Sequence, residues 1–413
     1  MSDKKNVPKI RFPGFTEPWE QRKLGEICSR VQGNDGRMEL PTLTISAANG
    51  WMKQEDRFSG NIAGKEQKNY TLLHKGELSY NHGNSKLAKY GTVFSLQTYE
   101  EALVPRVYHS FKVESGSADF IEYYFSTKMP NRELRKLISS GARMDGLLNI
   151  GYDDFMGIKM MFPSTLEQDK IAEYFRALDH LITLHQRKLE HVKKMKKSML
   201  QKMFPKKNQL YPEVRFPGFT DAWEQRKFGE ITELKSASRV HKDEWTSNGV
   251  PFYRSSDVMA AINGTENEKA FISEELYEKL SKVSGKLEEG DILVTGGGSV
   301  GNPYIVTNNK PLYTKDADLL WIKNKGKFHP YFLYEFFFSP TFRNYLGSIS
   351  HVGTIAHYTI TQLSDTPICL PSFDEQKEVG EYFQSLDNLI TLHQRELDHL
   401  QLLKKGMLQQ MFI

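Results

Sequence analysis

Residues 162–204 read FPSTLEQDKIAEYFRALDHLITLHQRKLEHVKKMKKSMLQKMF, and residues 370–412 read LPSFDEQKEVGEYFQSLDNLITLHQRELDHLQLLKKGMLQQMF. The two stretches align without a gap, and about 25 of their 43 positions are identical. A shorter repeat, here called the PGF motif, precedes each of them: residues 7–27 read VPKIRFPGFTEPWEQRKLGEI, and residues 211–231 read YPEVRFPGFTDAWEQRKFGEI. The chain is therefore one half-unit used twice.

Each long repeat predicts one helix. Ser164 and Ser372 stand three residues before Glu167 and Glu375, which is the capping-box pattern of a helix start. Apolar residues then recur at alternating spacings of four and three, as at the a and d positions of a coiled coil. A helix of about 37 residues would be roughly 55 Å long. The predicted pairing seam consists of Ile171, Phe175, Leu178, Ile182, His185, Leu189, Val379, Phe383, Leu386, Ile390, His393 and Leu397.

These apolar seams need partners. Because their registers match, we expect the two helices to pair with each other, although pairing with another chain stays open. His185 and His393 occupy equivalent seam positions. A metal site or a pH switch is the alternative for these histidines, but polar seam residues more often set the register, so we interpret them in that way.

The repeats divide the chain into four segments and predict an α+β fold. Residues 28–161 and 232–369 share little sequence, yet both contain a strand-like stretch followed by an aromatic helix-like stretch. The sequence predicts one globular domain before each long helix, with internal pseudo-twofold symmetry. The predicted segments are residues 1–161 (first domain), 162–204 (first long helix), 205–369 (second domain) and 370–413 (second long helix).

Composition excludes several classes of protein. The chain has 413 residues with a formal net charge of +4, which by itself does not indicate a nucleic-acid partner. Two cysteines form neither a disulfide framework nor a cysteine-rich zinc site. The first residues show no signal peptide, and no apolar run approaches the roughly 20 residues of a membrane helix. We expect a soluble cytoplasmic protein without membrane association.

Polar and basic loop residues in both domains are candidates for DNA contact. Arg, Asn, Lys and His are residue types that read base edges in the major groove, and loops carry recognition in many folds. For any one of these residues, ordinary solvated surface remains an alternative. The candidates are Asn81, His82, Asn84, Lys86, Lys89, Arg106 and Arg143 in the first domain, and Arg254, Ser255, Ser256, Thr295, Ser299, Asn302, His351, Thr354 and His357 in the second.

No stretch predicts catalysis or metal binding. Residues 297–301, GGSVG, fit the nucleophile-elbow pattern, which requires a strand, a sharp turn and a helix. Here a second strand-like stretch follows, so we expect a glycine-rich hairpin. The same glycines lack the ending of a phosphate-binding loop, and no set of His and Cys has metal-ligand spacing. We therefore predict no catalytic and no metal-binding residues.

The double arrangement of PGF motif, variable domain and LDxLITLHQR helix resembles the specificity subunit of a type I DNA restriction–modification system, over about residues 7 to 412. The VPFYRSSDV and GDILVTGGGSVG segments are similar to the family's target-recognition domains, whereas the first domain departs from that pattern. The resemblance implies two target-recognition domains joined by antiparallel paired helices. Each domain would bind one half of a split, asymmetric sequence in double-stranded DNA.

The resemblance also implies a division of labour between subunits. Two methylase subunits would dock on the repeated regions, and motor-nuclease subunits would join them for restriction. The S-adenosylmethionine, ATP and magnesium sites would belong to those partners, and an adenine N6, flipped out by the methylase, would be methylated. This chain would bind no cofactor and perform no chemistry. Two alternatives stay open: a non-DNA coiled-coil scaffold that bridges two proteins, and a self-contained DNA methylase or nuclease.

Overall fold

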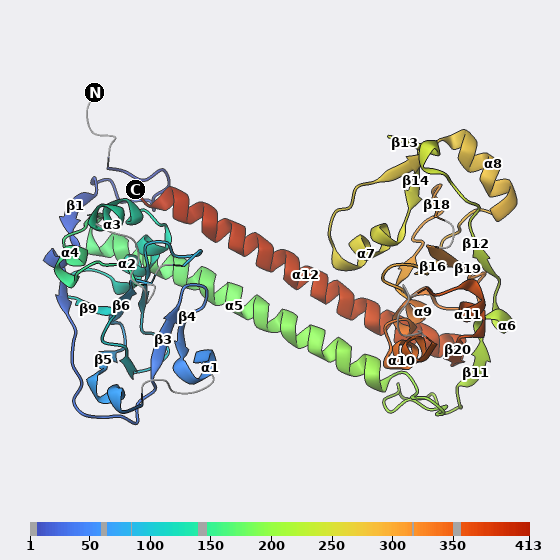
Figure 1. The fold of residues 1–413 in the computed structure, drawn as a ribbon, viewed down its shortest axis with the longest axis horizontal. Coiled ribbons are helices and arrows are strands. Elements are labelled where there is room, and N and C mark those ends of the chain that lie inside the picture. The colour runs from blue at the N-terminus through green and yellow to red at the C-terminus, as the bar shows by residue number, and fades with distance from the viewer. Residues whose placement is uncertain (1–5, 59–63, 84, 139–146, 316–317, 350–356) are drawn as a thin grey trace. The chain divides into compact units, whose positions relative to one another are not determined.

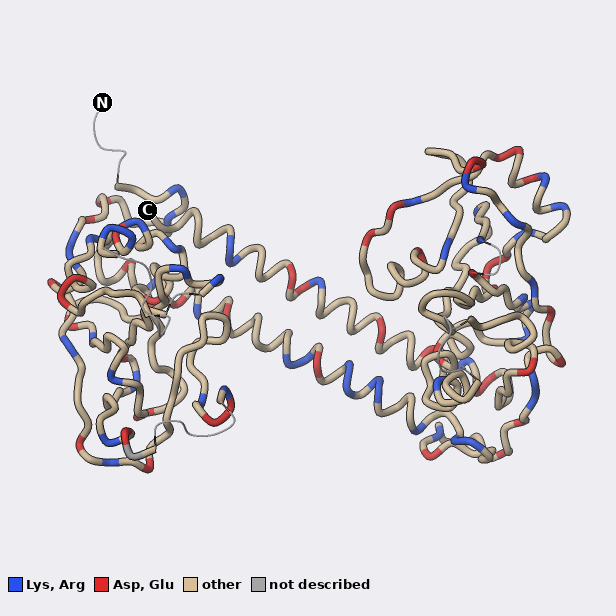
Figure 2. The backbone as a smooth tube through the Cα atoms, in the orientation of Figure 1, with Lys and Arg blue, Asp and Glu red and all other residues tan. Residues whose placement is uncertain are grey.

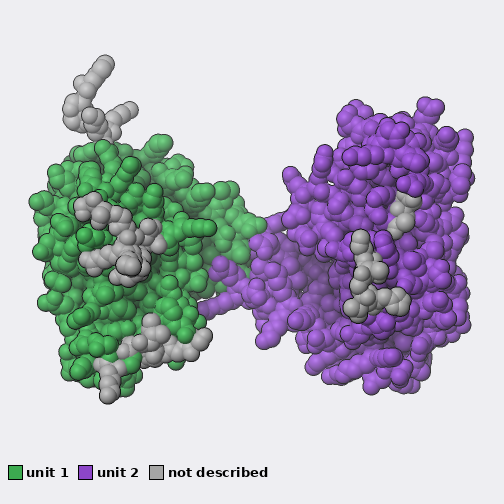
Figure 3. Space-filling model, viewed as in Figure 1, with its two compact units in different colours: residues 1–185, 396–413 green, residues 186–395 purple. Residues whose placement is uncertain are grey.

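The computed structural model describes residues 6–58, 64–83, 85–138, 147–315, 318–349 and 357–413. The chain divides into two compact units (Figure 3). Unit 1 consists of residues 1–185 and 396–413, and unit 2 of residues 186–395. Each unit therefore combines one variable domain with part of both long helices.

Unit 1 is a small α+β domain (Figure 1). Its strands β2, β9, β6 and β7 form an antiparallel sheet in that order, and β1–β10, β3–β4 and β5–β8 are two-stranded sheets. Its strands are β1 (Glu20–Lys23), β2 (Cys28–Arg30), β3 (Leu43–Ser46), β4 (Gly50–Lys53), β5 (Thr71–His74), β6 (Leu78–Asn81), β7 (Thr92–Ser95), β8 (Glu101–Val104), β9 (His109–Val113) and β10 (Lys159–Phe162). Its helices are α1 (Gln54–Phe58), α2 (Ala118–Ser126), α3 (Asn131–Leu137) and α4 (Tyr152–Met156), with 3-10 turns at Leu24–Glu26 and Gly64–Asn69.

Unit 2 repeats the central sheet of unit 1 as β12-β19-β16-β17, and it adds a sheet in the order β13-β15-β14-β18 in which β14 and β18 run parallel. Its strands are β11 (Glu224–Lys227), β12 (Leu234–Ser236), β13 (Trp245–Thr246), β14 (Val250–Tyr253), β15 (Ala270–Ile272), β16 (Ile292–Thr295), β17 (Pro303–Ile305), β18 (Tyr313–Thr314), β19 (Leu319–Ile322) and β20 (Pro367–Leu370). Its helices are α6 (Phe228–Ile231), α7 (Ser255–Asn263), α8 (Glu274–Ser284), α9 (Pro330–Phe336), α10 (Pro340–Ile349) and α11 (Ile360–Asp365), with a 3-10 turn at Lys242–Glu244.

The long repeats form the continuous helices α5 (Thr165–Lys202) and α12 (Phe373–Met411), as predicted. Ser164 caps α5, because its hydroxyl accepts the N–H of Glu167 at 3.4 Å. The capping box is only half realised, however. The Glu167 carboxylate does not reach back to the cap; it accepts two hydrogen bonds from Arg11, at 2.6 and 2.7 Å. Glu375 is used in the same way by Arg215 of unit 2.

The two long helices pair antiparallel inside unit 1. The ring of Phe175 lies 5.9 Å from that of Phe412, and four residues further along α5 Asp179 Oδ1 lies 2.5 Å from Lys404 Nζ. Position numbers rise along α5 while they fall along α12, so the helices run in opposite directions. Unit 2 repeats both contacts: the rings of Phe383 and Phe204 are 6.2 Å apart, and Lys196 Nζ lies 2.7 Å from Asp387 Oδ2. The predicted fold class is confirmed.

The PGF motif closes the same core in each unit. Trp19 packs edge-on against Phe120 and Phe412, with ring centroids 5.7 and 6.1 Å apart. In unit 2, Trp223 packs against Phe332 and Phe204 at 5.7 and 6.2 Å. Both tryptophans are buried. The buried seam residues Ile171, Phe175 and Leu178 belong to this core, so the first turns of α5 pack against the domain as well as against α12.

Candidate nucleic-acid interface

The hairpin formed by β16 and β17 carries three predicted DNA-binding residues in or beside its glycine-rich loop, residues 296–302. Because the two strands pair antiparallel, GGSVG is a hairpin loop and not a nucleophile elbow. Thr295 is fully buried, and its hydroxyl accepts the N–H of Asn302 at 2.9 Å. The Asn302 amide donates to the Ser299 carbonyl at 2.8 Å. Thr295 and Asn302 thus shape the loop, whereas Ser299 is exposed on it.

Arg254 begins helix α7 and is held within the fold. Its backbone N–H and its Nε both donate to Asp257 Oδ2, at 2.9 and 3.0 Å. Its guanidinium group also lies over the ring of Trp245, 5.5 Å from the centroid. In this conformation the Arg254 side chain fixes the start of α7, and base contact would require it to exchange these partners.

Three segments of unit 2 meet around Asp318 and Gly296. The Asp318 carbonyl accepts hydrogen bonds from Ser255 Oγ at 3.0 Å and from the N–H of Gly296 at 2.7 Å. The Gly296 carbonyl in turn accepts the N–H of Tyr358 at 2.8 Å. His357, next to Tyr358 in the chain, is exposed. The structure therefore brings together the start of α7, the glycine-rich loop and His357, which are far apart in the sequence.

Two basic residues near this junction were missed by sequence reasoning. Lys315 Nζ lies 2.7 Å from Asp318 Oδ2, and Arg343 donates to Asn302 Oδ1 at 2.9 Å. Burial lowers the pKa of Arg343 from its ordinary value. No motif marked either residue, because Lys315 follows a short strand and Arg343 lies in an aromatic helix whose pattern predicts core packing.

In unit 1 the candidates begin where β6 ends. The Asn81 amide donates to the Ile45 carbonyl at 3.2 Å, and Asn81 Oδ1 accepts the N–H of Gly83 at 3.0 Å. His82 is buried, with its ring 4.9 Å from that of His109. Burial also lowers the pKa of His109, which favours its neutral form. Asn81 and His82 thus support the loop from inside.

The remaining candidates differ in accessibility. The exposed ones are Lys86, Lys89, Arg106, Ser256, Ser299 and His357. Four candidates lie outside the described residues: Asn84, Arg143, His351 and Thr354. Exposed side chains can reach a duplex without rearrangement, so the exposed set is the part of the prediction that the structure leaves accessible.

A pocket of about 490 Å³ in unit 1, here called the unit 1 pocket, adjoins the loop that follows β6. Asn81, Gly83 and Ser85 line one side of it, and residues of β3, α1 and the segment after β8 line the rest. Gln54 lines it too and is buried. Sequence reasoning missed Gln54, because a single glutamine between a strand and a charged turn carries no signal.

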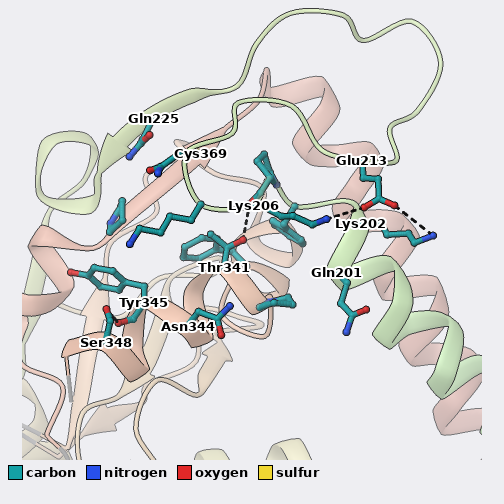
Figure 4. A pocket seen from close by; sticks show the side chains of 17 residues that line it. Gln201, Lys202, Lys206, Glu213, Gln225, Thr341, Asn344, Tyr345, Ser348 and Cys369 are labelled. Carbon is teal, nitrogen blue, oxygen red and sulfur yellow. Dashed lines mark hydrogen bonds and ion pairs between the residues drawn. The ribbon is translucent and has the colours of Figure 1, made fainter. Parts of the chain in front are cut away.

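A cavity of about 570 Å³ in unit 2 lies where residues 205–208 pass over α10 (Figure 4). Thr341 Oγ1 donates to the Pro205 carbonyl at 2.6 Å. Lys202 and Lys206 lie 3.8 and 3.3 Å from the same carboxylate, that of Glu213. None of the predicted DNA-binding residues is among its described lining residues, so this cavity is not part of the candidate DNA-binding loops.

Neither the distribution of charged residues nor the arrangement of possible metal ligands helps to locate the DNA-binding site. Figure 2 shows Lys and Arg interspersed with Asp and Glu in both units, which agrees with a net charge of only +4. Within the part of the chain that the structure describes, no group of three His, Cys, Asp or Glu side chains is arranged to hold a metal ion. None of the described helices is both long enough and apolar enough to cross a lipid bilayer.

Residues 220–402 match the family model described as "Type I restriction modification DNA specificity domain". The chain is 26% identical over 300 residues to the type I restriction enzyme MjaVIII specificity subunit of Methanocaldococcus jannaschii, covering 70% of this chain and 68% of that protein. It is 24% identical over 420 residues to a putative type I restriction enzyme MjaX specificity subunit of the same organism, covering 97% and 89%.

The chain is a relative of the type I specificity subunits. The predicted family is thereby confirmed. The crystal structure of an S subunit of a type I restriction–modification system from M. genitalium has the same fold, with a TM-score of 0.60 at 14% identity, covering 98% of this chain and 99% of that one. The repeated frame found in units 1 and 2 thus belongs to a chain that is similar to type I specificity subunits over nearly its whole length.

Proposed function

We propose that this chain is the DNA sequence-recognition subunit of a type I restriction–modification complex, and that each unit reads one half of a bipartite, asymmetric target in double-stranded DNA. One observation carries the proposal: the two units repeat the same frame but carry different loops. Arg11–Glu167 and Arg215–Glu375 have identical geometry, with 2.6 Å between Nε and Oε1. The loops that follow β6 and β16 share no such identity. A constant frame with variable loops suits a protein whose geometry is fixed while its target changes.

The chemistry of the complex is assigned to the other subunits. S-adenosylmethionine binds to the methylase, and ATP and magnesium bind to the motor-nuclease subunits. The methylated atom is an adenine N6, and the adenine is flipped out into the methylase. This chain selects the DNA sequence on which the complex acts, binds no cofactor and catalyses no step. It acts in the cytoplasm, where its DNA substrate is found.

Two copies of the methylase dock on the repeated helices. Leu181 and Leu184 on α5, and their counterparts Leu389 and Leu392 on α12, are between 37% and 51% exposed. Isolated exposed leucines are common, but here the same pair is exposed in both copies of the repeat. An apolar pair that recurs at equivalent positions suits a partner that is present twice. The motor-nuclease subunits then join the assembled methylase.

Co-expression with the cognate methylase tests the proposal. Mapping modified adenines by single-molecule sequencing should give one asymmetric sequence in two parts. Replacing residues 232–369 with the corresponding domain of a relative should change one part and leave the other intact. Methyl transfer by the chain without a methylase, or methylation without sequence preference, would contradict the proposal.

The docking surface has its own test. Leu389→Lys with Leu392→Lys should weaken methylase binding to unit 2 by at least about tenfold, because a charge would be buried in an apolar contact. Leu402→Lys is the matched control: Leu402 is 69% exposed on the same helix, and its counterpart on α5 is Lys194, so this change copies the other repeat. Equal effects of the two substitutions would remove the leucine pair from the interface.

A further inference from the structure

The unit 1 pocket has the size and lining of a ligand site. Its volume of about 490 Å³ falls within the usual range of roughly 300–1,000 Å³ for small-molecule pockets. Phe58, Tyr70 and Tyr108 contribute aromatic surface, and Gln54 and Asn81 contribute side-chain amides. The pocket adjoins the loop after β6, which holds the predicted DNA-binding residues of this unit.

One polar group in this pocket is buried and unsatisfied. Gln54 is only 1% exposed, and its Nε2 donates to the hydroxyl of Tyr70 at 3.1 Å. Its Oε1 makes no hydrogen bond to any residue in the described part of the chain. If the amide were turned over, one of its two polar atoms would still lack a partner. Buried polar groups are almost always paired in native proteins, so this atom points to a ligand that donates a hydrogen bond.

Tyr70 completes a two-point contact. Its hydroxyl oxygen accepts the hydrogen bond from Gln54, which leaves the hydroxyl hydrogen able to donate elsewhere. The residue that carries the acceptor Gln54 Oε1 is therefore joined, through its Nε2, to the donor hydroxyl of Tyr70. This pair complements a ligand edge that carries a donor next to an acceptor. The pairing edge of every nucleobase has that arrangement, and a planar base also stacks on aromatic side chains.

Other polar groups in the wall are already committed to the fold. Arg57 donates to the Ile45 carbonyl at 2.7 Å, and the Asn81 amide donates to the same carbonyl at 3.2 Å. The hydroxyls of Thr44 and Tyr108 lie 3.0 Å apart and bond to each other. These contacts hold β3, α1 and the end of β6 in position around the pocket. These walls are therefore fixed by the fold, and Gln54 and Tyr70 line the same pocket with unused bonding capacity.

We propose that the unit 1 pocket binds a single unstacked nucleobase, held at its pairing edge by Gln54 and Tyr70. The proposal rests on the proposed function in one respect, because bound DNA is one source of such a base. The base comes either from the duplex, as an extrahelical nucleotide of the half-site that unit 1 reads, or from a free nucleoside. Unit 1 would then recognise one base outside the helix, in addition to any contacts in the groove.

Mismatched duplexes test the DNA source, with the full chain bound to its mapped target. Each base pair of the half-site read by unit 1 is replaced in turn by a mismatch, which lowers the cost of extruding a base. At one position we expect the mismatch to tighten binding by about tenfold, whereas mismatches at contacted pairs weaken it. The gain should disappear in Gln54→Leu and in Tyr70→Phe, which removes the hydroxyl but keeps the ring. Gln21→Leu, an exposed change on β1, is the control and should keep the gain.

Titration of the full chain with free adenosine, guanosine, cytidine and thymidine tests the second source. Binding of one nucleoside by wild-type chain, lost in Gln54→Leu and Tyr70→Phe, would support the pocket with a free ligand. If no mismatch tightens binding and no nucleoside binds, the proposal is overturned. It is also overturned if both substitutions leave the gain unchanged. A chain that binds no duplex selectively would instead refute the proposed function, and the nucleoside titration would still decide the pocket.

Discussion

Arg11 and Arg215 each place a guanidinium group against a glutamate that is fully buried. In each pair, Nε of the arginine donates to one carboxylate oxygen at 2.6 Å and Nη2 donates to the other at 2.7 Å. A buried carboxylate is tolerated only while its partner is present, since desolvation strongly disfavours an unpaired charge. The PGF motif is thereby fastened to the first turn of each long helix, and the Glu of the helix start is used for this purpose instead of a capping box.

Arg215→Ala should lower the free energy of unfolding by about 3 kcal/mol, because it leaves the buried Glu375 carboxylate without its cationic partner, although Trp223 Nε1 still donates to it at 3.2 Å. Urea unfolding of the full chain measures the change. Arg226→Ala is the control: Arg226 Nε lies 3.4 Å from Glu224 Oε1, and both side chains are largely exposed, so we expect a change below about 1 kcal/mol. Similar losses in the two variants would show that Arg215 contributes no more than a surface ion pair.

Glu335 gives the chain a pH-dependent stability. The residue is fully buried, 2.8 Å from Lys196 Nζ, and Lys196 also pairs with Asp387. Burial raises the pKa of Glu335 from 4.5 to about 8; Asp387 acts in the same direction, and Lys196 opposes both. The equivalent position in unit 1 is Tyr123, whose hydroxyl donates to Asp179 at 2.9 Å, so unit 1 carries a phenol and not a carboxyl group at this position.

The direction in which stability changes with pH follows from proton binding by Glu335. Between about pH 4.5 and 8 the folded chain holds the Glu335 proton more tightly than the unfolded chain, so this residue's contribution to stability falls as the pH rises. Glu335→Gln should therefore stabilise the chain relative to wild type by about 1–2 kcal/mol more at pH 8.5 than at pH 4.5. Urea unfolding at both pH values measures this. Glu396→Gln, at an exposed position of α12, should show no pH-dependent difference, and parallel curves for Glu335→Gln would refute the account.

At the scale of single elements, α12 carries two glycines with opposite surroundings. A Cβ atom at Gly380 would lie 2.9 Å from the backbone nitrogen of Phe332, whereas one at Gly406 would have nothing within 4 Å. The start of α9 therefore crosses α12 too closely for a side chain at position 380. The equivalent residue of α5 is Ala172. Gly380 therefore marks a position at which the two units pack differently.

Gly380→Ala should destabilise the chain by about 1–3 kcal/mol, because overpacking at α9 outweighs the gain of about 1 kcal/mol in helix propensity. Gly406→Ala has the same propensity gain without the contact, so it should stabilise the chain by about 0.5–1 kcal/mol. Thermal unfolding of the two variants beside wild type measures both signs. Stabilisation by Gly380→Ala would mean that α9 yields readily at this crossing.

Periodicity explains which elements the sequence predicts well. The a and d spacing and the Ser caps predicted two helices of about 37 residues, and the helices contain 38 and 39. The predicted strand-like stretches, residues 77–80 and 291–295, overlap β6 and β16, and the predicted aromatic stretches, residues 120–127 and 328–339, overlap α2 and α9. The common four-stranded sheet was not predicted, because its strands are three to five residues long and pair across the variable sequence.

The candidate site was less predictable for a physical reason. Residue type indicates what a side chain can bind, but tertiary contacts decide whether it is available. Asn81 and Arg254 have groups suited to base edges, yet both bond to neighbouring parts of their own unit. Gln54 was overlooked, although its buried amide has unused bonding capacity. Burial and pairing depend on the packed structure, and a single sequence without a motif does not reveal them.

At the scale of the whole molecule, the repeat separates the structural frame from the variable recognition surface. The frame recurs in both units as the same ion pairs and ring contacts, whereas the small sheets differ: unit 1 has β3–β4 and β5–β8, and unit 2 has β13-β15-β14-β18. Bulk charge therefore averages frame and recognition surface together, which is why +4 gives little indication of DNA binding.

The continuous helices give the final prediction. Both α5 and α12 cross the boundary between the units, near His185 and Arg395. Seven residues inserted at both points keep the a and d register and lengthen each helix by about 10.5 Å, or roughly three base pairs of DNA. We expect the methylated target to keep both half-sites with a gap about three base pairs longer. Binding should be weaker, because three base pairs also turn one half-site around the duplex by nearly a third of a turn. Methylation mapping of the co-expressed complex measures the gap. Insertion in one helix alone should break the pairing and abolish methylation, and an unchanged gap after the double insertion would refute the spacer role.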